Sequence, residues 1–186
     1  MSRTVLVAYA TKMGSTAGIA EAIGAELRRG GHRVDVRDVA EVGSIAAYDA
    51  VVLGSAVYIR RWRPEAVRFL RRHADELRER QVWLFHSGSL GADKDTPQSL
   101  PRNVVRLVHR IGATPPVTFA GRLDPAAARG FLAGRLARGD LAGDFRDWDR
   151  IARWARDVSS AISSVEVSSW SRPDAARNNK PEGATR

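Results

Sequence analysis

Small and hydroxyl-bearing side chains are concentrated in residues 11–16, where a stretch with helical spacing begins. The segment consists of Thr11, Lys12, Met13, Gly14, Ser15 and Thr16. The backbone N–H groups at a helix start have no partner within the helix, and the helix dipole makes that end positive. Together with hydroxyl donors, these groups favour a phosphate. Residues 11–16 therefore predict a phosphate-binding loop, although Ser15 or Thr16 could instead serve only as a helix cap.

Two more loops of small residues follow apolar, strand-like runs, at residues 54–62 and 87–91. The first carries Tyr58 and Trp62, so it could bring backbone amides to a flat ring and cover one face of it. Either aromatic side chain could instead pack under the next helix. The chain lacks both the G-x-x-x-x-G-K-[ST] loop of nucleoside triphosphatases and the G-x-G-x-x-G dinucleotide fingerprint. The three loops together predict a site for a different phosphorylated planar cofactor.

These loops have to be positioned by strands that alternate with helices. Apolar or alternating runs predict strands at residues 4–8, 32–39, 48–53, 81–86 and 116–121. Helical spacing predicts helices at residues 15–29, 64–80, 101–111 and 151–162. Such alternation implies an α/β fold whose parallel sheet binds ligands at the carboxyl ends of its strands. We expect one domain over residues 1–165, with an insertion at 124–143, followed by a disordered tail at 168–186.

The composition excludes several kinds of chemistry. The 186 residues include no cysteine, which rules out disulfides, cysteine-ligated zinc, iron–sulfur clusters and a thiol nucleophile. Lys and Arg number 30 and Asp and Glu 21, so the net charge is +9, and nearly all of the cations are arginines. No apolar run approaches the roughly 20 residues of a spanning helix, and the chain does not open with a leader pattern. We therefore expect a cytoplasmic protein.

The first loop resembles the flavin mononucleotide (FMN) phosphate loop of the flavodoxin family, since it reads Thr11-x-x-Gly14-Ser15-Thr16. The other two loops fall where that family contacts the isoalloxazine ring. Three further stretches are similar to a narrower group, the flavodoxin-like protoporphyrinogen dehydrogenases that use menaquinone. These stretches are residues 69–77, 96–98 and 147–158. The resemblance extends over roughly residues 3–162 and leaves out the tail.

The resemblance implies a five-stranded sheet in the order 2-1-3-4-5 and bound FMN. It places the phosphate on residues 11–16. It places the ring on Ala56, Val57, Tyr58 and Ile59, and on Ser87, Gly88, Ser89, Leu90 and Gly91. The implied activity is oxidation of protoporphyrinogen IX or a related reduced substrate, with a quinone as acceptor. An electron carrier of the flavodoxin type is the alternative. We assign no catalytic residue, because His86 and His73 more often have structural roles at such places.

The positive charge bears on possible partners. Arginines at positions 60, 61 and 63 could guide a substrate with propionate groups or a quinone at an anionic membrane surface. This would allow peripheral contact with the inner face of the membrane. Nucleic acid is not an expected partner, because the charge is spread along the chain without a recognised binding motif. A receiver-type signalling domain is excluded, since Gly54 stands where such a domain needs an aspartate.

Overall fold

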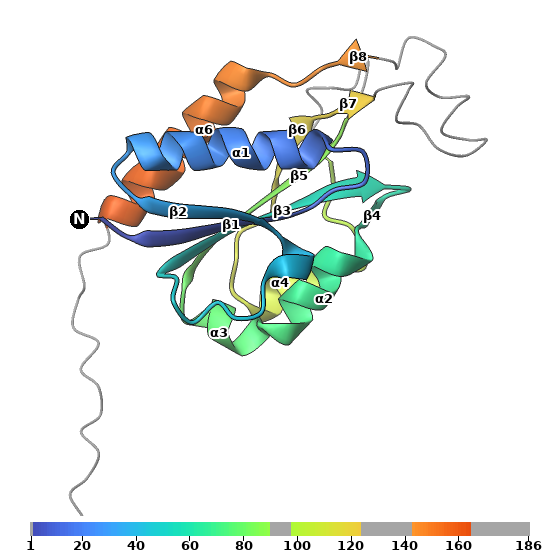
Figure 1. Ribbon diagram of the computed structural model, residues 1–186. Helices are drawn as coiled ribbons and strands as arrows, with labels where there is room; N and C mark the ends of the chain where they lie inside the picture. The colour runs from blue at the N-terminus through green and yellow to red at the C-terminus, as the bar shows by residue number, and fades with distance from the viewer. Residues whose placement is uncertain (1, 90–97, 124–142, 165–186) are drawn as a thin grey trace, which may run out of the picture.

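The computed structural model describes residues 2–89, 98–123 and 143–164 (Figure 1). The elements are β1 Thr4–Ala10, α1 Ser15–Arg29, β2 Arg33–Asp38, the 3-10 turn η1 Val39–Glu41, β3 Ala50–Tyr58, β4 Arg61–Trp62, α2 Pro64–Arg72, α3 Ala74–Arg78, β5 Gln81–Ser89, α4 Val105–Arg110, β6 Val117–Ala120, β7 Arg122–Leu123, β8 Gly143–Asp144 and α6 Trp148–Ser164. Nearly all of the expected insertion and the whole of the expected tail lie outside the described residues, as do Leu90 and Gly91.

The sheet confirms the predicted fold class. Five parallel strands lie in the order β2-β1-β3-β5-β6. Numbered among themselves, these strands have the expected order 2-1-3-4-5. The short β4 pairs antiparallel with the end of β3, and β7 and β8 form a separate two-stranded ribbon. The carboxyl ends of β1, β3 and β5 therefore meet at one edge, which is where the three predicted loops begin.

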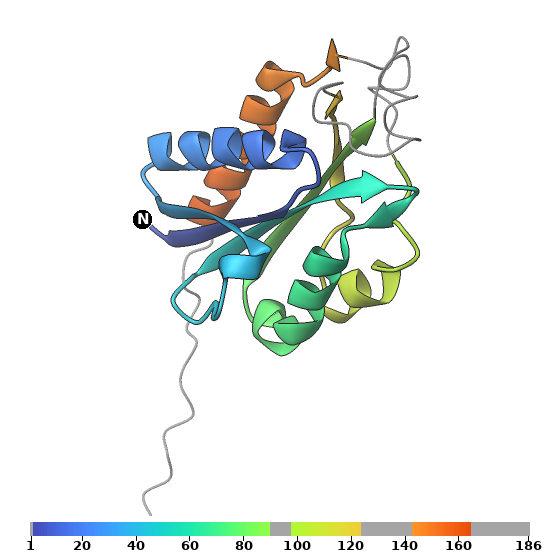
Figure 2. The same cartoon turned by 45° about the vertical axis from the view of Figure 1, so that its right-hand side comes forward.

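Helices cover both faces of the sheet (Figure 2). On one face α1 presents Ile19, Ile23 and Leu27, spaced four residues apart, and they pack with α6 into one apolar core. On the other face α2, α3 and α4 bury a second core that includes Phe69 and Leu70. The central strands contribute to both cores, since successive side chains point to opposite faces. This explains why β1 and β3 are apolar almost without interruption.

The structure corrects the expected helix over residues 64–80, which is two helices separated at His73. The N–H of His73 bonds to the carbonyl of Phe69 and closes α2, and the carbonyl of His73 accepts from Leu77 in α3. The His73 side chain is buried at this break and bonds to Glu76. No proline or glycine stands there, so local propensity gave no sign of the interruption.

Three other expected boundaries also shift. β3 continues through Gly54 to Tyr58, five residues beyond its expected end, because β1, β5 and β4 supply hydrogen-bond partners to the extra length. β5 likewise continues to Ser89. The helix expected at 101–111 is shorter, since α4 occupies only Val105–Arg110. In β3 and β5, pairing with the neighbouring strands overrides the turn preference of the glycine and serine residues.

Candidate functional site

The predicted phosphate loop, residues 11–16, meets the start of α1 in a conformation that suits an anion. Gly14 is the N-cap residue and has φ +80°, a left-handed conformation that favours glycine. No side chain caps the helix, and its first turn contains no acidic residue. The first-turn N–H groups therefore keep their positive potential without a protein group to neutralise it.

The three hydroxyls of this loop differ in their partners. Ser15 Oγ accepts a hydrogen bond from the backbone N of Arg122 at 2.9 Å. Thr16 is buried, and its Oγ1 lies 2.8 Å from Ser87 Oγ on β5. The hypothesis that Ser15 or Thr16 caps α1 is therefore wrong. Thr11 Oγ1 is buried and has no hydrogen-bond partner among the described residues, so this hydroxyl is a candidate donor to a phosphate oxygen.

The second predicted loop is mostly a β-hairpin. Ala56, Val57 and Tyr58 belong to β3, and only Ile59 and Arg60 form the turn to β4. Both turn residues have positive φ, 50° and 56°, as a two-residue type I′ hairpin turn requires. Ile59 is also 71% exposed, the largest value among the big apolar side chains in the described part of the chain.

Lys12 joins the phosphate loop to this hairpin. Its Nζ lies 3.4 Å from the centre of the Tyr58 ring, a cation–π contact. The aromatic face of Tyr58 is thus turned toward the phosphate loop. Because Thr16 also contacts Ser87, the first loop is tied to both of the others. The structure therefore brings the three predicted segments together at one edge of the sheet.

The second and third segments share a groove. Val57 and Ile59 line it from the hairpin, and Gly88 lines it from β5. A Cβ atom on Gly88 would lie 2.9 Å from the Cβ of Val57, so glycine is needed for this close approach. Ser87 is buried and Gly88 partly so at the end of β5. Ser89 ends the strand, and the rest of the third predicted loop, Leu90 and Gly91, lies outside the described residues.

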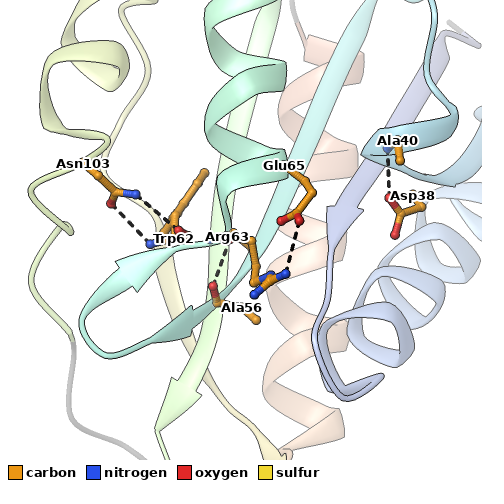
Figure 3. A network of polar contacts seen from close by, with 8 residues as sticks. Asp38, Ala40, Ala56, Trp62, Arg63, Glu65 and Asn103 are labelled. Atoms are coloured by element: carbon orange, nitrogen blue, oxygen red, sulfur yellow. Dashed lines mark hydrogen bonds and ion pairs between the residues drawn. The ribbon is translucent and has the colours of Figure 1, made fainter.

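Sequence reasoning missed the other wall of this groove, which residues 98–103 supply. Its polar members are Gln98, Ser99, Arg102 and Asn103. Asn103 holds the hairpin in place, because its Oδ1 accepts from the Trp62 backbone N at 3.3 Å and its Nδ2 donates to the Trp62 carbonyl at 3.2 Å (Figure 3). Only the stretch at 96–98 signalled this segment, and it did so through family resemblance alone.

Trp62 and His86 lie under the groove and anchor its walls. Trp62 is buried in the core, as the packing alternative proposed, and its Nε1–H donates to His86 Nδ1 at 3.3 Å. Nδ1 therefore accepts, so Nε2 carries the hydrogen and donates to Thr118 Oγ1 at 2.8 Å. The same Thr118 oxygen accepts from the Gln98 backbone N at 2.9 Å. His86 thus links the hairpin to the 98–103 wall.

His86 is fully buried, and burial lowers its pKa to about 4. The ring is therefore neutral near pH 7, and its two nitrogens are occupied by Trp62 and Thr118. A neutral, fully bonded imidazole suits a positioning role better than proton transfer. His73 also packs locally, with Nδ1 bonded to Glu76 at the break between α2 and α3. Neither histidine is placed as a catalytic group in the groove.

The described residues contain neither a metal-binding cluster nor a membrane-spanning helix. No group of three or more His, Asp or Glu side chains among them could hold a metal ion. Nor does any helix in the described ranges have the length and apolarity to cross a membrane. The three arginines expected to guide a substrate or quinone differ in position: Arg60 and Arg61 line the groove, whereas Arg63 is half-buried and forms an ion pair with Glu65.

Residues 6–126, more than half of the chain, match the family model described as a flavodoxin domain. This protein belongs to the flavodoxin family. Proteins of this family bind FMN. No curated protein shows significant similarity to the chain. The family model describes a flavodoxin domain and does not show the narrower resemblance to protoporphyrinogen dehydrogenases.

Solved structures show the same fold. The TIGR4 flavodoxin of Streptococcus pneumoniae has a TM-score of 0.59 at 18% identity, over 85% of this chain and 99% of that one. Flavodoxin 2 from Bacillus cereus has a TM-score of 0.53 at 19% identity, over 86% and 99%. The rubredoxin oxygen:oxidoreductase of Desulfovibrio gigas has a TM-score of 0.59 at 14% identity, over 86% of this chain but only 36% of that protein. This flavodoxin-family chain thus spans the length of the flavodoxins and about a third of the larger enzyme.

Proposed function

We propose that this protein binds FMN at the carboxyl edge of its sheet and acts as an FMN-dependent oxidoreductase. The buried hydroxyl of Thr11 carries this proposal, since it lacks a partner inside the loop where the family holds a phosphate. The site fits the cofactor: it offers an uncapped helix start, no acidic side chain in the first turn, and Lys12 beside the loop.

Different residues would hold the phosphate and the ring of FMN. Residues 11–16 would hold the phosphate through backbone N–H groups and the Thr11 hydroxyl. The groove between Val57, Ile59 and Gly88 would hold the ring. When bound, FMN supplies the exchange of hydride or single electrons with a substrate, and the protein supplies position and electrostatics. Thr16 and Ser87 hold the phosphate loop against β5, which keeps the two parts of the site in register.

For the substrate, we propose protoporphyrinogen IX or a related reduced molecule with carboxylate groups, and a quinone as acceptor. Arg60, Arg61 and Arg102 line the groove beside the ring position, and guanidinium groups bind carboxylates in a bidentate manner. The resemblance of residues 69–77 to protoporphyrinogen dehydrogenases supports the same choice. A quinone acceptor would bring this basic rim to an anionic membrane surface.

A flavodoxin-type electron carrier is the second candidate. It is favoured by length, since the chain spans 99% of the Streptococcus and Bacillus flavodoxins. The net charge of +9 speaks for the enzyme, because a carrier of the usual kind presents an acidic surface to its basic reductases.

Anaerobic reduction of the FMN-loaded protein tests this proposal. We expect protoporphyrinogen to bleach the flavin absorbance by two-electron reduction. Fluorescent porphyrin, whose formation removes six electrons from protoporphyrinogen, should appear only after menadione is added to reoxidise the flavin repeatedly. The variant Arg61→Gln should raise KM for protoporphyrinogen by about tenfold, the value of one charge-assisted contact, whereas Arg153→Gln on α6 should leave KM unchanged. Flavin that stays oxidised with protoporphyrinogen but accepts single electrons from a reductase would favour the carrier.

A further inference from the structure

Buried polar atoms without partners are concentrated along α2. In the described part of the chain, four buried side-chain atoms have no hydrogen-bond partner: Thr11 Oγ1, Arg63 Nε, Glu65 Oε2 and His73 Nε2. Such atoms are rare in folded proteins, and each needs an explanation. The FMN site accounts for Thr11 alone. The other three atoms lie at the two ends of α2. The ends of this helix therefore carry buried polar atoms whose hydrogen bonds are not satisfied within the described residues.

A separate cavity of about 540 Å³ lies between α2 and η1, which pack against each other. We call it the α2 pocket. Its buried apolar side chains are Val39, Val42 and Phe69. Ligand pockets range from about 300 to 1,000 Å³, so this one could take a small molecule. No residue that lines it also lines the groove of the FMN site.

The rim of the α2 pocket is cationic. Arg68, Arg71 and Arg72 line it, and all three are exposed. None has an ion-pair partner among the described residues. Arginines three and four positions apart on a helix repel one another, so the cluster destabilises the empty helix slightly. An anion in the pocket would relieve that repulsion and accept bidentate hydrogen bonds.

Two acidic side chains near the rim, Glu65 and Glu76, are already engaged by other side chains. Glu65 Oε1 accepts from Arg63 Nη2 at 3.2 Å, and Figure 3 shows the two side chains pointing toward each other. Glu76 Oε1 bonds to His73, and its Oε2 lies 3.9 Å from Arg80 Nη2. The remaining Glu65 oxygen is buried and has no hydrogen-bond donor among the residues that the structure describes.

His73, which also lines the pocket, carries a second buried atom without a hydrogen-bond partner among the described residues. The residue is only 3% exposed, and its ring packs against Phe69 at 4.8 Å between centroids. Since Glu76 accepts from Nδ1 at 3.0 Å, that nitrogen carries the hydrogen and Nε2 is left without a partner. The pocket thus combines two buried rings with a cationic rim. This combination suits an amphipathic anion, whose apolar part would pack on the rings and whose charged group would contact the arginines.

We propose that the α2 pocket binds a small organic anion, in which an apolar or aromatic body packs on Val39, Val42 and Phe69 and a carboxylate or phosphate contacts the arginine rim. The pocket is thus a ligand site distinct from the FMN site. The inference rests on the pocket, its apolar wall and its arginine rim, and it stands whether or not FMN binds.

Backbone amide NMR tests the site directly, with phenyl phosphate and phenylacetate as probes of the two anion types. We expect one or both to shift the amide signals of Val42, Phe69 and His73 in a saturable way. Shifts confined to residues 11–16 would show capture by the phosphate loop and overturn the proposal. Phenethylamine, with the same aromatic body and the opposite charge, should leave the pocket signals unmoved; equal shifts with this cation would also overturn it.

Matched charge variants separate the pocket from general attraction. Arg72→Gln removes an exposed rim charge and should weaken binding of the better probe by about tenfold, the usual value of a lost charge-assisted hydrogen bond. Arg106→Gln removes one exposed charge on α4, away from the lining of the pocket, and should change the affinity less than twofold. Equal weakening by both variants would reduce the effect to net charge and contradict a built site.

Discussion

Replacing His86 by glutamine should change how the stability of this protein depends on pH. The imidazole is fully buried, and burial holds its pKa at about 4 instead of the ordinary 6.5. In the unfolded chain the ring takes up a proton below about pH 6.5. The folded ring stays neutral to about pH 4, because burial away from water penalises the charged form of the imidazole. Between these values the unfolded state binds more protons, so acid favours unfolding.

The size of the effect follows from the two pKa values. Neutral burial of His86 is fully stabilising above pH 6.5 and loses its contribution as the pH falls toward 4. At about 1.4 kcal/mol for each pH unit, the difference between 6.5 and about 4 corresponds to about 3 kcal/mol of unfolding free energy. That is a large part of the total stability of about 5–15 kcal/mol that a typical domain has.

Urea unfolding followed by circular dichroism between pH 4.5 and 7.5 measures this contribution. Carboxylates also titrate in part of this range, so the informative quantity is the difference between variants. The wild-type free energy of unfolding should fall by about 1.4 kcal/mol per pH unit more steeply than that of His86→Gln below pH 6. His109→Gln, which alters an exposed histidine on α4, should keep the wild-type slope. Parallel pH profiles for wild type and His86→Gln would refute the reasoning.

Three further substitutions test local features of the site. Gly14→Ala should lower the free energy of unfolding by about 1 kcal/mol, because alanine is strained at φ +80°, and should weaken FMN binding; a fully stable variant in urea would contradict the left-handed cap. Replacing Ile59 and Arg60 together by Asn and Gly should raise the urea midpoint, with a gain of about 1–2 kcal/mol, since Asn-Gly is the preferred type I′ pair; a lower midpoint would argue against that turn. Thr16→Val should cost about 1–3 kcal/mol by leaving the buried Ser87 hydroxyl without its partner, and an unchanged melting temperature would show that the bond is not needed.

Sequence patterns were sufficient for the sheet and for the start of α1 after residues 11–14. The five strand-like runs are continuous or alternating in hydrophobicity, and that pattern follows from burial between helices on both faces. The start of α1 was predictable because residues 11–16 combine glycine and hydroxyls at a strand-to-helix junction. Both features are local, so neighbouring residues carry enough information to find them.

The hairpin and the second wall of the groove needed the structure. Ile59 and Arg60 carry no Asn-Gly signal, and the turn is imposed by the pairing of Val57 with Trp62. The position of Trp62 depends on Asn103 and His86, which are 41 and 24 residues away in sequence. Contacts of this range leave no periodic trace. The same holds for the break between α2 and α3, which no proline or glycine marks.

Titration of the flavin-free protein with FMN, followed by quenching of flavin fluorescence, tests the central claim most directly. The wild type should quench one equivalent of FMN. Thr11→Val should bind FMN about tenfold more weakly while its free energy of unfolding stays the same or rises, because the valine methyl replaces a buried hydroxyl that has no partner. An FMN-binding protein in which Thr11→Val changes nothing would contradict the assigned phosphate loop. A wild type that quenches no FMN would contradict the whole account.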